Sequence, residues 1–340
     1  MNDENSGLAW TEVKALLNNL PGPDEDAISA FRARNGDLPK DVGSLGRVEE
    51  LGEWLAAWQG RYPAAISRPM VYVFAATHGL AQQNPSPSAS DSMARMMANY
   101  SSGGAAINQL CVDAGAGLQL FELALEMPTG DITCEPAMTE ADCISALAFG
   151  MEAVGDGVDL LCLGEMGIGN ITVAAAVCCA LFGGEPEDWT GGPSSEADAV
   201  KRALALHKPA MNDPVAILTL IGGREFAAIT GAIIAARTRR IPVLLDGFVV
   251  GAAAAILHAI KPGVLDHCMA AHLSGDHGHG RLLDILGKRP ILDLGIKSGE
   301  ANGAALAIPI VRAAAAVHSG MAAVAEAIGA EAVDVETGEV

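Results

Sequence analysis

Hydrophobic residues occur along the chain in short continuous runs that alternate with longer stretches of helical character. The runs end at glycine, polar or acidic residues, which is typical of strands buried on both faces; they span residues 71–76, 118–123, 158–163, 243–246, 269–273 and 291–294. The stretches between them have the length and the helix-forming residues of crossover helices; they span residues 93–114, 140–154, 172–182, 197–206, 226–239, 249–260 and 281–286. This alternation predicts an α/β fold whose mostly parallel sheet is covered by helices on both faces.

The two ends of the chain depart from this alternation. The N-terminal part is acidic and helical over residues 10–20 and then meets a Pro-Gly-Pro stop, whereas residues 301–329 form a long alanine-rich stretch. We expect both ends to pack together as a small helical domain. The predicted boundaries are 35–300 for the large α/β domain, and 1–34 with 301–340 for the small one. Two segments rich in Gly, Pro and Ser are expected to be ligand-facing loops, at residues 82–92 and 183–195.

The composition narrows the kind of packing to expect. Half of the 340 residues are hydrophobic, only 4% are aromatic, and 39 are glycine. Small residues in this number favour closely packed helices and many glycine turns over an aromatic-rich sandwich.

The charge balance excludes several classes of partner. The chain has 21 Lys and Arg against 41 Asp and Glu, a net charge of −20, which repels nucleic acid and anionic lipid. Its long apolar stretches at 171–182 and 249–260 are shorter than the roughly 18 residues that a membrane helix needs. The N-terminus has neither the basic nor the apolar region of a secretory signal. We therefore expect a cytoplasmic protein that holds any anionic ligand by local geometry.

The most informative segment is Leu160–Ala176. A predicted buried strand runs into a glycine-rich turn and a helix begins near Thr172, so backbone N–H groups and the positive helix end meet at the carboxyl edge of the sheet. This pattern favours an anion cradle, although a turn that only allows close packing has the same spacing. The glycines match neither the dinucleotide fingerprint nor the Walker loop. Glu165 within this turn indicates a contact to ribose hydroxyls or to a developing cation.

A second candidate is the segment 297–303, which precedes the apolar C-terminal helix. Glu300 would lie near the start of that helix, where a carboxylate is favourable simply as a charge or cap. Alternatively, Glu300 is a general base, because a carboxylate beside apolar walls has a raised pKa suited to deprotonating a weakly acidic heterocycle. The residues alone leave both interpretations open.

Two further places combine polar residues with the end of a predicted strand. The histidine-rich stretch 272–279 matches no standard metal site and the seven cysteines contain no C-x-x-C pair, so we predict no metal and no disulfide framework. Within it, Ser274 is a better candidate as an anion-binding hydroxyl. Asp246 follows a buried strand, where ligands collect in open α/β sheets, or it caps the next helix.

Eight short motifs occur in an order that a known family shares. They are Gly43–Arg47, Thr77–Gly79, Gly104–Gln109, Gly164–Asn170, Gly222–Glu225, Pro242–Phe248, His272–Ser274 and Gly299–Ala307. They occur in the order of that family over nearly the whole chain. The chain thereby resembles the nicotinate-nucleotide:dimethylbenzimidazole phosphoribosyltransferase family, which makes the lower-ligand nucleotide of cobalamin.

The resemblance implies a Rossmann-like large domain, a homodimer, and no metal or redox cofactor. It implies a reaction in which a benzimidazole nitrogen attacks C1′ of nicotinate mononucleotide, nicotinate leaves, and the β-link becomes an α-link. Glu300 matches the general base and Glu165 matches a second carboxylate facing the ribose. By the same match the phosphate would face the amides of Gly167, Ile168 and Gly169 together with Ser274, and Asn170 is a further substrate-binding position. The other matched substrate-binding positions are Thr77, His78, Asp246, Ser298 and Gly299.

Several positions depart from the motifs of that family. Thr77 stands where the family usually has Asp or Asn before His-Gly, and Ala301 stands where the family has Gly. Glu196 is nearest to the place where the family supplies a phosphate-contacting lysine, for which Lys201 or Arg202 could compensate. Ser298 replaces an apolar residue of the base pocket, which favours a smaller or more polar base. The last two departures motivate an alternative from another class, a diverged paralogue that binds a base or nucleotide as a sensor or partner subunit. A nicotinamide-dependent dehydrogenase lacks its glycine fingerprint here.

Overall fold

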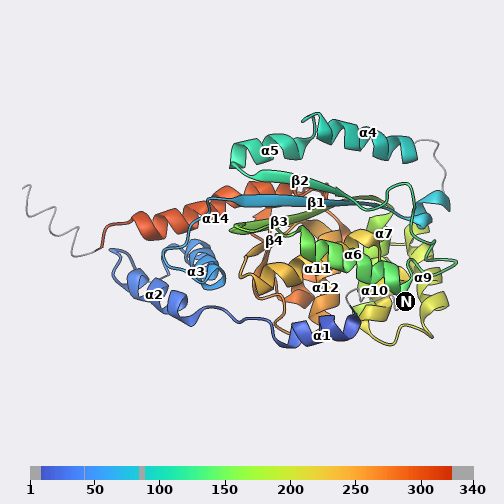
Figure 1. The fold of residues 1–340 in the computed structure, drawn as a ribbon, viewed down its shortest axis with the longest axis horizontal. Coiled ribbons are helices and arrows are strands. Elements are labelled where there is room, and N and C mark those ends of the chain that lie inside the picture. The colour runs from blue at the N-terminus through green and yellow to red at the C-terminus, as the bar shows by residue number, and fades with distance from the viewer. Residues whose placement is uncertain (1–8, 42, 84–88, 324–340) are drawn as a thin grey trace, which may run out of the picture. The chain divides into compact units, whose positions relative to one another are not determined.

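A five-stranded parallel sheet forms the centre of the computed structural model, which describes residues 9–41, 43–83 and 89–323 (Figure 1). Its strands are β1 (Pro69–Thr77), β2 (Gly117–Glu122), β3 (Leu160–Ile168), β4 (Val243–Leu245) and β5 (Cys268–Ala270). All neighbouring strands run parallel, in the order β2-β1-β3-β4-β5. A separate parallel pair joins β6 (His272–Leu273) to β7 (Leu292–Asp293). The predicted α/β class and parallel sheet are confirmed.

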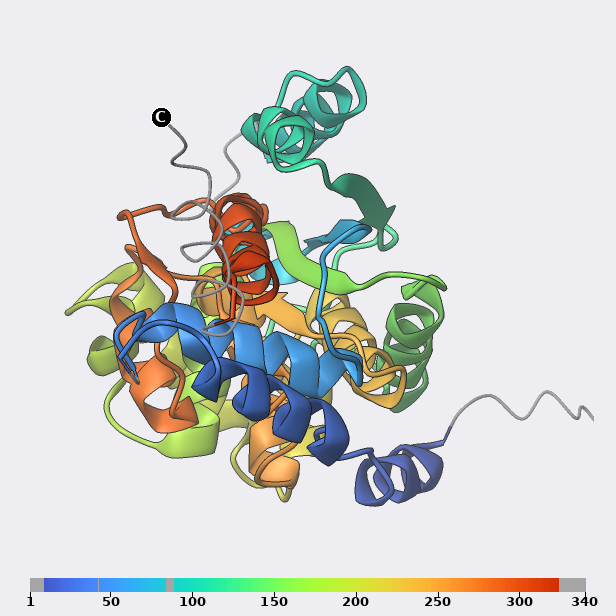
Figure 2. The ribbon, with the colours of Figure 1, turned by 90° about the vertical axis from the view of Figure 1, so that its left-hand side faces the viewer.

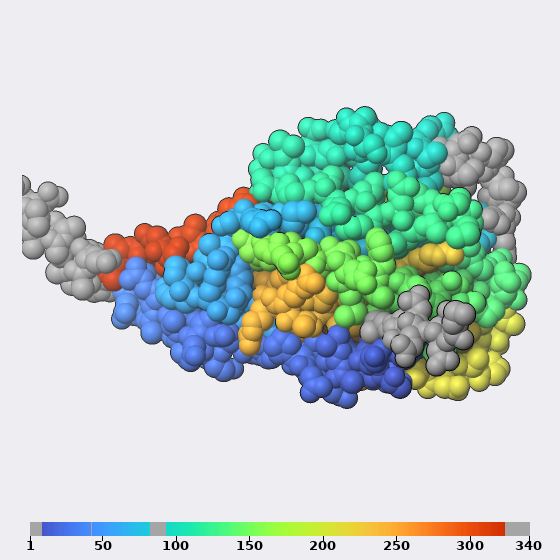
Figure 3. Space-filling view, in the orientation of Figure 1, coloured from blue at the N-terminus to red at the C-terminus, as the bar shows by residue number. Residues whose placement is uncertain are grey.

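Helices precede, separate and follow these strands along the chain. They are α1 (Trp10–Asn18), α2 (Glu25–Gly36), α3 (Arg47–Gln59), α4 (Ala89–Ser101), α5 (Ala106–Ala114), α6 (Glu140–Ala153), α7 (Asn170–Phe182), α8 (Pro186–Thr190), α9 (Ser195–His207), α10 (Pro214–Ile221), α11 (Arg224–Thr238), α12 (Gly247–Ile260), α13 (His277–Leu286) and α14 (Asn302–Gly320). A 3-10 turn, η1 (Gly79–Gln83), follows β1. Figure 1 shows α6, α11 and α12 below the strands and α4 with α5 above β2, where their atoms form the upper layer in Figure 3.

Several predicted elements differ from the structure. The helix expected over 93–114 is two helices, because Gly103 adopts a left-handed φ of 77° and ends α4. The strand expected over 269–273 is divided between β5 and β6, and β3 continues through the glycine segment as far as Ile168. The loop expected over 183–195 contains α8, and the loop expected over 82–92 overlaps the start of α4 and includes residues outside the described ones.

The described residues form two compact units. The larger contains the described part of Met1–Pro21 and Arg68–Ala307, and the smaller contains Gly22–Ser67 and the described part of Ile308–Val340. These boundaries differ from the predicted 34/35 and 300/301. The N-terminal helix α1 packs into the core of the larger unit through Trp10, Val13 and Leu17, whereas α3 belongs to the smaller unit.

The core of the larger unit depends on close contact between helices. All residues of α11 from Glu225 to Arg237 are buried, and α11 packs against α6. A Cβ added at Gly150 would lie 1.8 Å from the backbone oxygen of Ala228, and one added at Gly231 would lie 2.0 Å from that of Leu147. Only glycine permits this approach. The expectation of closely packed helices is therefore confirmed, and Figure 2 shows the helices against the strands from a second direction.

By length and hydropathy alone, α14 qualifies as a helix that could cross a membrane, and it is the one such helix among the described residues. Half of its apolar window is buried within the fold. A core helix of a globular protein passes the same test, so its apolar character is explained by packing.

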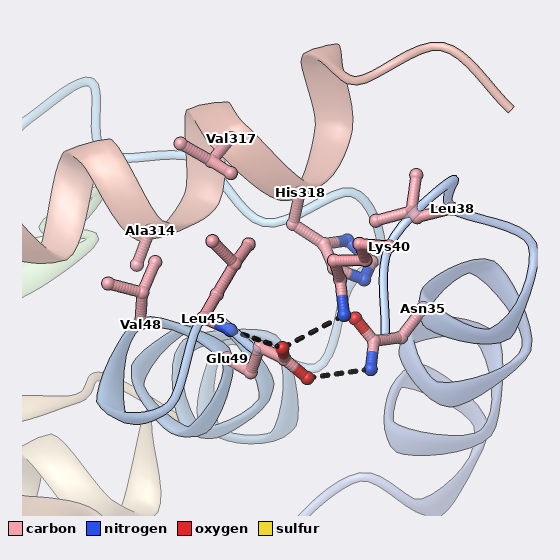
Figure 4. A pocket seen from close by; sticks show the side chains of 9 residues that line it. All are labelled: Asn35, Leu38, Lys40, Leu45, Val48, Glu49, Ala314, Val317 and His318. Atoms are coloured by element: carbon pink, nitrogen blue, oxygen red, sulfur yellow. Dashed lines mark hydrogen bonds and ion pairs between the residues drawn. The ribbon is translucent and has the colours of Figure 1, made fainter. Parts of the chain in front are cut away.

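The smaller unit contains a small pocket beside a buried ion pair (Figure 4). Lys40 Nζ lies 2.8 Å from Glu49 Oε1, and these side chains are only 7% and 13% exposed. Asn35 Nδ2 donates to the other oxygen of Glu49 at 2.9 Å, and the backbone N–H of Leu45 donates to Oε1 at 3.0 Å. The hydrogen bond from Lys40 is the main cause that lowers the pKa of Glu49 to about 2. Glu49 thus holds the turn that contains the Gly43–Arg47 motif.

Candidate active site

The strand order locates the region where a ligand would bind. The chain passes from β1 to one neighbour, β2, and then returns to the other side of β1 with β3. In doubly wound sheets ligands bind at this switch point, beyond the carboxyl ends of the strands. Thr77 and Ile168 are paired at these ends of β1 and β3. Two predicted site segments therefore meet at the place that the topology favours.

Glu165 is held by the turn that joins β3 to α7. The Glu165 side chain accepts a short hydrogen bond from Nδ2 of Asn170, the first residue of α7. Gly169 has a left-handed φ of 88° and lets the strand turn directly into the helix. Since the first backbone N–H groups of a helix have no partner within it, the start of α7 offers donors and positive potential at this edge.

The segment before α14 is joined directly to the same strand. The backbone N–H of Glu165 donates to the carbonyl of Gly299 at 2.8 Å. A Cβ added at Gly164 would lie 2.4 Å from the backbone N of Ala301, and one added at Gly299 would lie 2.0 Å from Oε1 of Glu165. The two glycines therefore permit the close approach that places Glu300 beside Glu165.

Asp246 is fully buried and is hydrogen-bonded to the first turn of α14, the helix that follows this segment. Its Oδ1 accepts from the backbone N–H of Ala304 at 2.8 Å, in the first turn of α14, and lies 3.1 Å from His272 Nε2. Asp246 makes no side-chain cap to α12, the helix that follows it. Burial lowers the pKa of His272, but hydrogen bonding and attraction to Asp246 outweigh it and the net shift is upward. A direct substrate contact of Asp246 stays a prediction; in the structure its carboxyl group holds the first turn of α14.

His78 and Thr77 also use their polar atoms within the protein. His78 Nε2 lies 2.5 Å from Glu225 Oε1, and the two side chains are 1% and 0% exposed. The Thr77 hydroxyl donates to the carbonyl of Leu125 at 3.0 Å. His78 is buried directly after the end of β1, and its contact with substrate stays a prediction.

A pocket of about 120 Å³ opens beside the start of α7. It is lined by Ile171, Thr172, Ala175, Trp189, Thr190, Glu196, Phe248, Gly275, Asp276, His277 and Lys297. Lys297 extends across Gly275, where an added Cβ would lie 2.8 Å from Lys297 Cε. Glu196 and Lys297 thus line one cavity, whereas Lys201 and Arg202 are not among its lining residues.

Ser274 lies directly before this pocket lining and is 6% exposed. Its hydroxyl donates to Asp276 Oδ2 at 2.8 Å, and its backbone N–H donates to His279 Nδ1 at 2.9 Å. Burial lowers the pKa of His279 to about 3, so this histidine is a neutral acceptor. On the other side of the site, the Ser298 hydroxyl accepts from Asn302 at 2.9 Å. Over the described residues no group of three or more His, Cys, Asp or Glu side chains could hold a metal ion.

The electrostatics of the site are dominated by carboxyl groups. Burial raises the pKa of Glu165 well above its ordinary value. Negative charge on Glu225, Asp246 and Glu300 adds to this effect, while the Asn170 hydrogen bond opposes it. The site therefore brings Glu165, whose pKa is raised by burial and by neighbouring negative charge, next to a second carboxyl group, Glu300. This pair can exchange or accept protons beside the anion-binding start of α7.

Three residues of this region had no role in the sequence predictions. Glu225 ends the Gly222–Glu225 motif, but the motif does not reveal that this residue pairs with His78. Lys297 begins the segment 297–303, and its place in the sequence does not reveal that it lines a pocket. Tyr100, near the end of α4, is 6% exposed, and the negative charge of Glu300 raises the pKa of its hydroxyl group. No local pattern distinguishes it from an ordinary core tyrosine.

Known proteins resemble this chain over nearly its whole length. A family model described as phosphoribosyltransferase matches residues 20–328. The nicotinate-nucleotide–dimethylbenzimidazole phosphoribosyltransferase of Sinorhizobium medicae is 53% identical over 330 residues, which cover 95% of this chain and 97% of that protein. The protein of the same name from Agrobacterium fabrum is 54% identical over 325 residues, covering 93% and 94%.

A solved structure agrees with these sequence matches. The crystal structure of the same kind of enzyme from Thermus thermophilus superimposes with a TM-score of 0.82 at 36% identity, covering 89% of this chain and 98% of that one. The matched range includes Glu165, Glu300 and the glycine turn before α7. The chain therefore belongs to the nicotinate-nucleotide–dimethylbenzimidazole phosphoribosyltransferase family.

Proposed function

We propose that this protein transfers the phosphoribosyl group of nicotinate mononucleotide to 5,6-dimethylbenzimidazole or a related base. The products are nicotinate and α-ribazole 5′-phosphate, an intermediate for the nucleotide loop of cobalamin. The observation that carries the proposal is the hydrogen bond between the backbone of Glu165 and that of Gly299, which brings the segments of Glu165 and Glu300 together at the switch point. The chain is also 53% identical over 95% of its length to an enzyme named for this reaction.

The bond changes define what the site must do. A nitrogen of the base attacks C1′, the bond from C1′ to the nicotinate nitrogen breaks with its electron pair going to nicotinate, and the configuration inverts from β to α. The other nitrogen of the base loses its proton. In this proposal Glu300 accepts that proton as general base. Its place in the segment before α14, fixed by Gly299 and by the Asp246 contact to Ala304, supports the role.

Glu165 acts on the ribosyl side. Burial raises the pKa of this carboxyl group, which disfavours a full negative charge before substrate binds. The pyridinium ring of nicotinate mononucleotide is cationic, and a nearby cation favours the ionised form. Binding of this cation would therefore lower the pKa of Glu165 and release its proton to solvent, so that a carboxylate faces C1′ as positive charge develops there.

The phosphate side is built by the turn before α7. Gly167, Ile168, Gly169 and Asn170 lead into the positive end of that helix, and Ser274 lies next to the neighbouring pocket. Lys297 lines this pocket and supplies the cation there, opposite the carboxylate of Glu196. Ser298 and Gly299 would contact the base, and Thr77 and His78 support the end of β1. No metal or redox cofactor takes part in this scheme.

The proposal extends to assembly, fold type and location. We infer a homodimer and a cytoplasmic enzyme from the family resemblance; a single monomeric species in sedimentation would contradict the first. We also infer a Rossmann-like doubly wound unit. The all-parallel strand order, with its switch between β1 and β3, supports that description.

The function is tested by product formation. Purified protein is incubated with nicotinate mononucleotide and dimethylbenzimidazole, and mass spectrometry follows nicotinate and α-ribazole 5′-phosphate. The same assay with unsubstituted benzimidazole, hydroxybenzimidazole and adenine measures the effect of Ser298 on the choice of base. Equal formation of both products supports the proposal. Calorimetric binding of a substrate without product from any base would instead support a non-catalytic paralogue.

A further inference from the structure

Tyr100 places a buried hydroxyl group beside the proposed general base. The residue is 6% exposed, and its hydroxyl has no hydrogen-bond partner at bonding distance. The ionisable groups that act on this hydroxyl are Glu300 from the segment before α14, Glu165 from β3, and Asp246 from the end of β4. A buried hydroxyl without a partner reduces stability, and such groups in folded proteins commonly mark a function.

The end of α4 is fixed in place by the backbone around Tyr100. The Tyr100 carbonyl accepts from the backbone N–H of Gly103 at 3.1 Å and from Asn108 Nδ2 at 3.2 Å. The N–H of Gly104 donates to the Asn99 carbonyl at 2.8 Å, and a Cβ at Gly104 would meet the Asn99 side chain at 2.2 Å. The α4–α5 corner thus holds the tyrosine, and α4 also contacts β3, the strand of Glu165.

The upward shift of the pKa of Tyr100 agrees with a hydroxyl group that keeps its proton and donates a hydrogen bond. Burial raises the pKa of Tyr100, and the negative charge of Glu300 raises it further. The phenol therefore keeps its proton and can donate to a carboxylate, but it cannot itself accept the proton of the base.

We propose that Tyr100 is a positioning residue for Glu300: its hydroxyl donates a hydrogen bond to one carboxylate oxygen and leaves the other oxygen to accept the proton of the attacking base. A hydrogen bond to the ionised form favours that form and fixes its direction. This inference rests on the proposed role of Glu300 and adds a second residue to the same step. Tyr100 makes and breaks no covalent bond.

The test compares Tyr100→Phe with a matched control, Tyr72→Phe. Tyr72 is also buried, at 2% exposure, but its hydroxyl accepts from the backbone N–H of Gly155 at 3.2 Å. Each change removes one oxygen atom from a buried ring. Steady-state kcat and KM for both substrates are measured from pH 5 to 9 by nicotinate release, and thermal unfolding is followed for each variant.

For Tyr100→Phe we expect kcat near pH 7 to fall by about tenfold and the acidic limb of the pH profile to move up by about one unit. Its melting temperature should be unchanged or higher, because the hydroxyl has no partner at bonding distance in the substrate-free structure and would engage Glu300 only when substrate is bound. Tyr72→Phe should show the reverse, with a lower melting temperature and an unchanged acidic limb.

Two results would overturn the inference. One is an acidic limb and kcat in Tyr100→Phe that equal those of the wild type. The other is a loss of kcat that is the same at every pH, because the hydroxyl would then not act through the ionisation of Glu300. An inactive wild-type protein would contradict the proposed function itself, so the two failures are distinguishable.

Discussion

Glu49 in the smaller unit and Glu165 in the larger unit are both shielded carboxyl groups, yet their surroundings are opposite. Glu49 receives hydrogen bonds from Lys40, Asn35 and the Leu45 backbone. Glu165 receives one side-chain hydrogen bond, from Asn170, and its charged neighbours are carboxylates. The pKa of Glu49 is lowered to about 2, whereas that of Glu165 is raised.

The difference separates a structural carboxylate from a functional one. Glu49 has nearly all of its hydrogen-bonding capacity satisfied, so its charge stabilises the folded state. Glu165 is kept where its charge is unfavourable, which reduces stability and leaves its charge to be matched by a cationic substrate. The functional carboxyl group is therefore recognised by surroundings that offer few hydrogen-bond donors and several negative charges. The following substitutions test this distinction.

Glu165→Gln should have the largest effect on activity. The amide keeps the shape of the side chain but cannot ionise as charge develops at C1′, so we expect kcat to fall by about a hundredfold or more. The same variant should be more stable than the wild type, by an amount that grows as pH rises from 5 to 8. This sign follows because a raised folded pKa costs stability once the unfolded group ionises.

Nicotinate release and urea unfolding measure these two quantities on the same samples. An active variant would remove Glu165 from the mechanism. A variant that is less stable at pH 8 than at pH 5, relative to the wild type, would contradict the raised pKa.

Glu49→Gln should mainly affect stability. It leaves Lys40 without its partner, and we expect a loss of about 2 kcal/mol in the free energy of unfolding near pH 7. Because the folded pKa of Glu49 is lowered from 4.5 to about 2, its contribution is present above pH 4.5 and disappears as pH falls through this range.

Glu53→Gln is the matched control for this change. Glu53 pairs with Arg32 in the same unit, but these side chains are 31% and 67% exposed, so the loss should be under about 1 kcal/mol. Equal losses for the two variants in urea unfolding would contradict the structural role of Glu49.

Asp246→Asn should have a smaller effect, on activity. The asparagine oxygen can still accept from the Ala304 N–H, but the attraction to His272 and to the positive start of α14 is lost. We expect kcat to fall by about fivefold, with KM changed by less than twofold, because Glu300 is held less firmly. A larger change in KM than in kcat would indicate a direct substrate contact, which the buried position of Asp246 argues against.

The sequence predicted the parts of this molecule that depend on local patterns. The strands of the main sheet and the turn at Gly169 follow from apolar runs that end at glycine. The two units were predicted less well: α1 and α3 have apolar faces, but which core receives each face depends on distant residues such as Phe31 and His318, which stack at 3.6 Å.

The candidate site shows the same limit. Glu165 and Glu300 were identified by motif, and the structure adds the backbone bond that joins their segments. Asp246 and His78 were expected to contact substrate, but their partners, Ala304 and Glu225, are brought in by other elements. Tyr100 has no motif, since its importance arises only when the α4–α5 corner is folded over β3.

The most direct test of the proposed mechanism is the steady-state rate of Glu300→Gln. The amide keeps the shape of the side chain but cannot accept the proton of the base, so kcat for nicotinate release should fall by about a hundredfold or more, with KM for both substrates within about threefold of the wild type. A variant that turns over at the wild-type rate would contradict the assignment of Glu300 as general base.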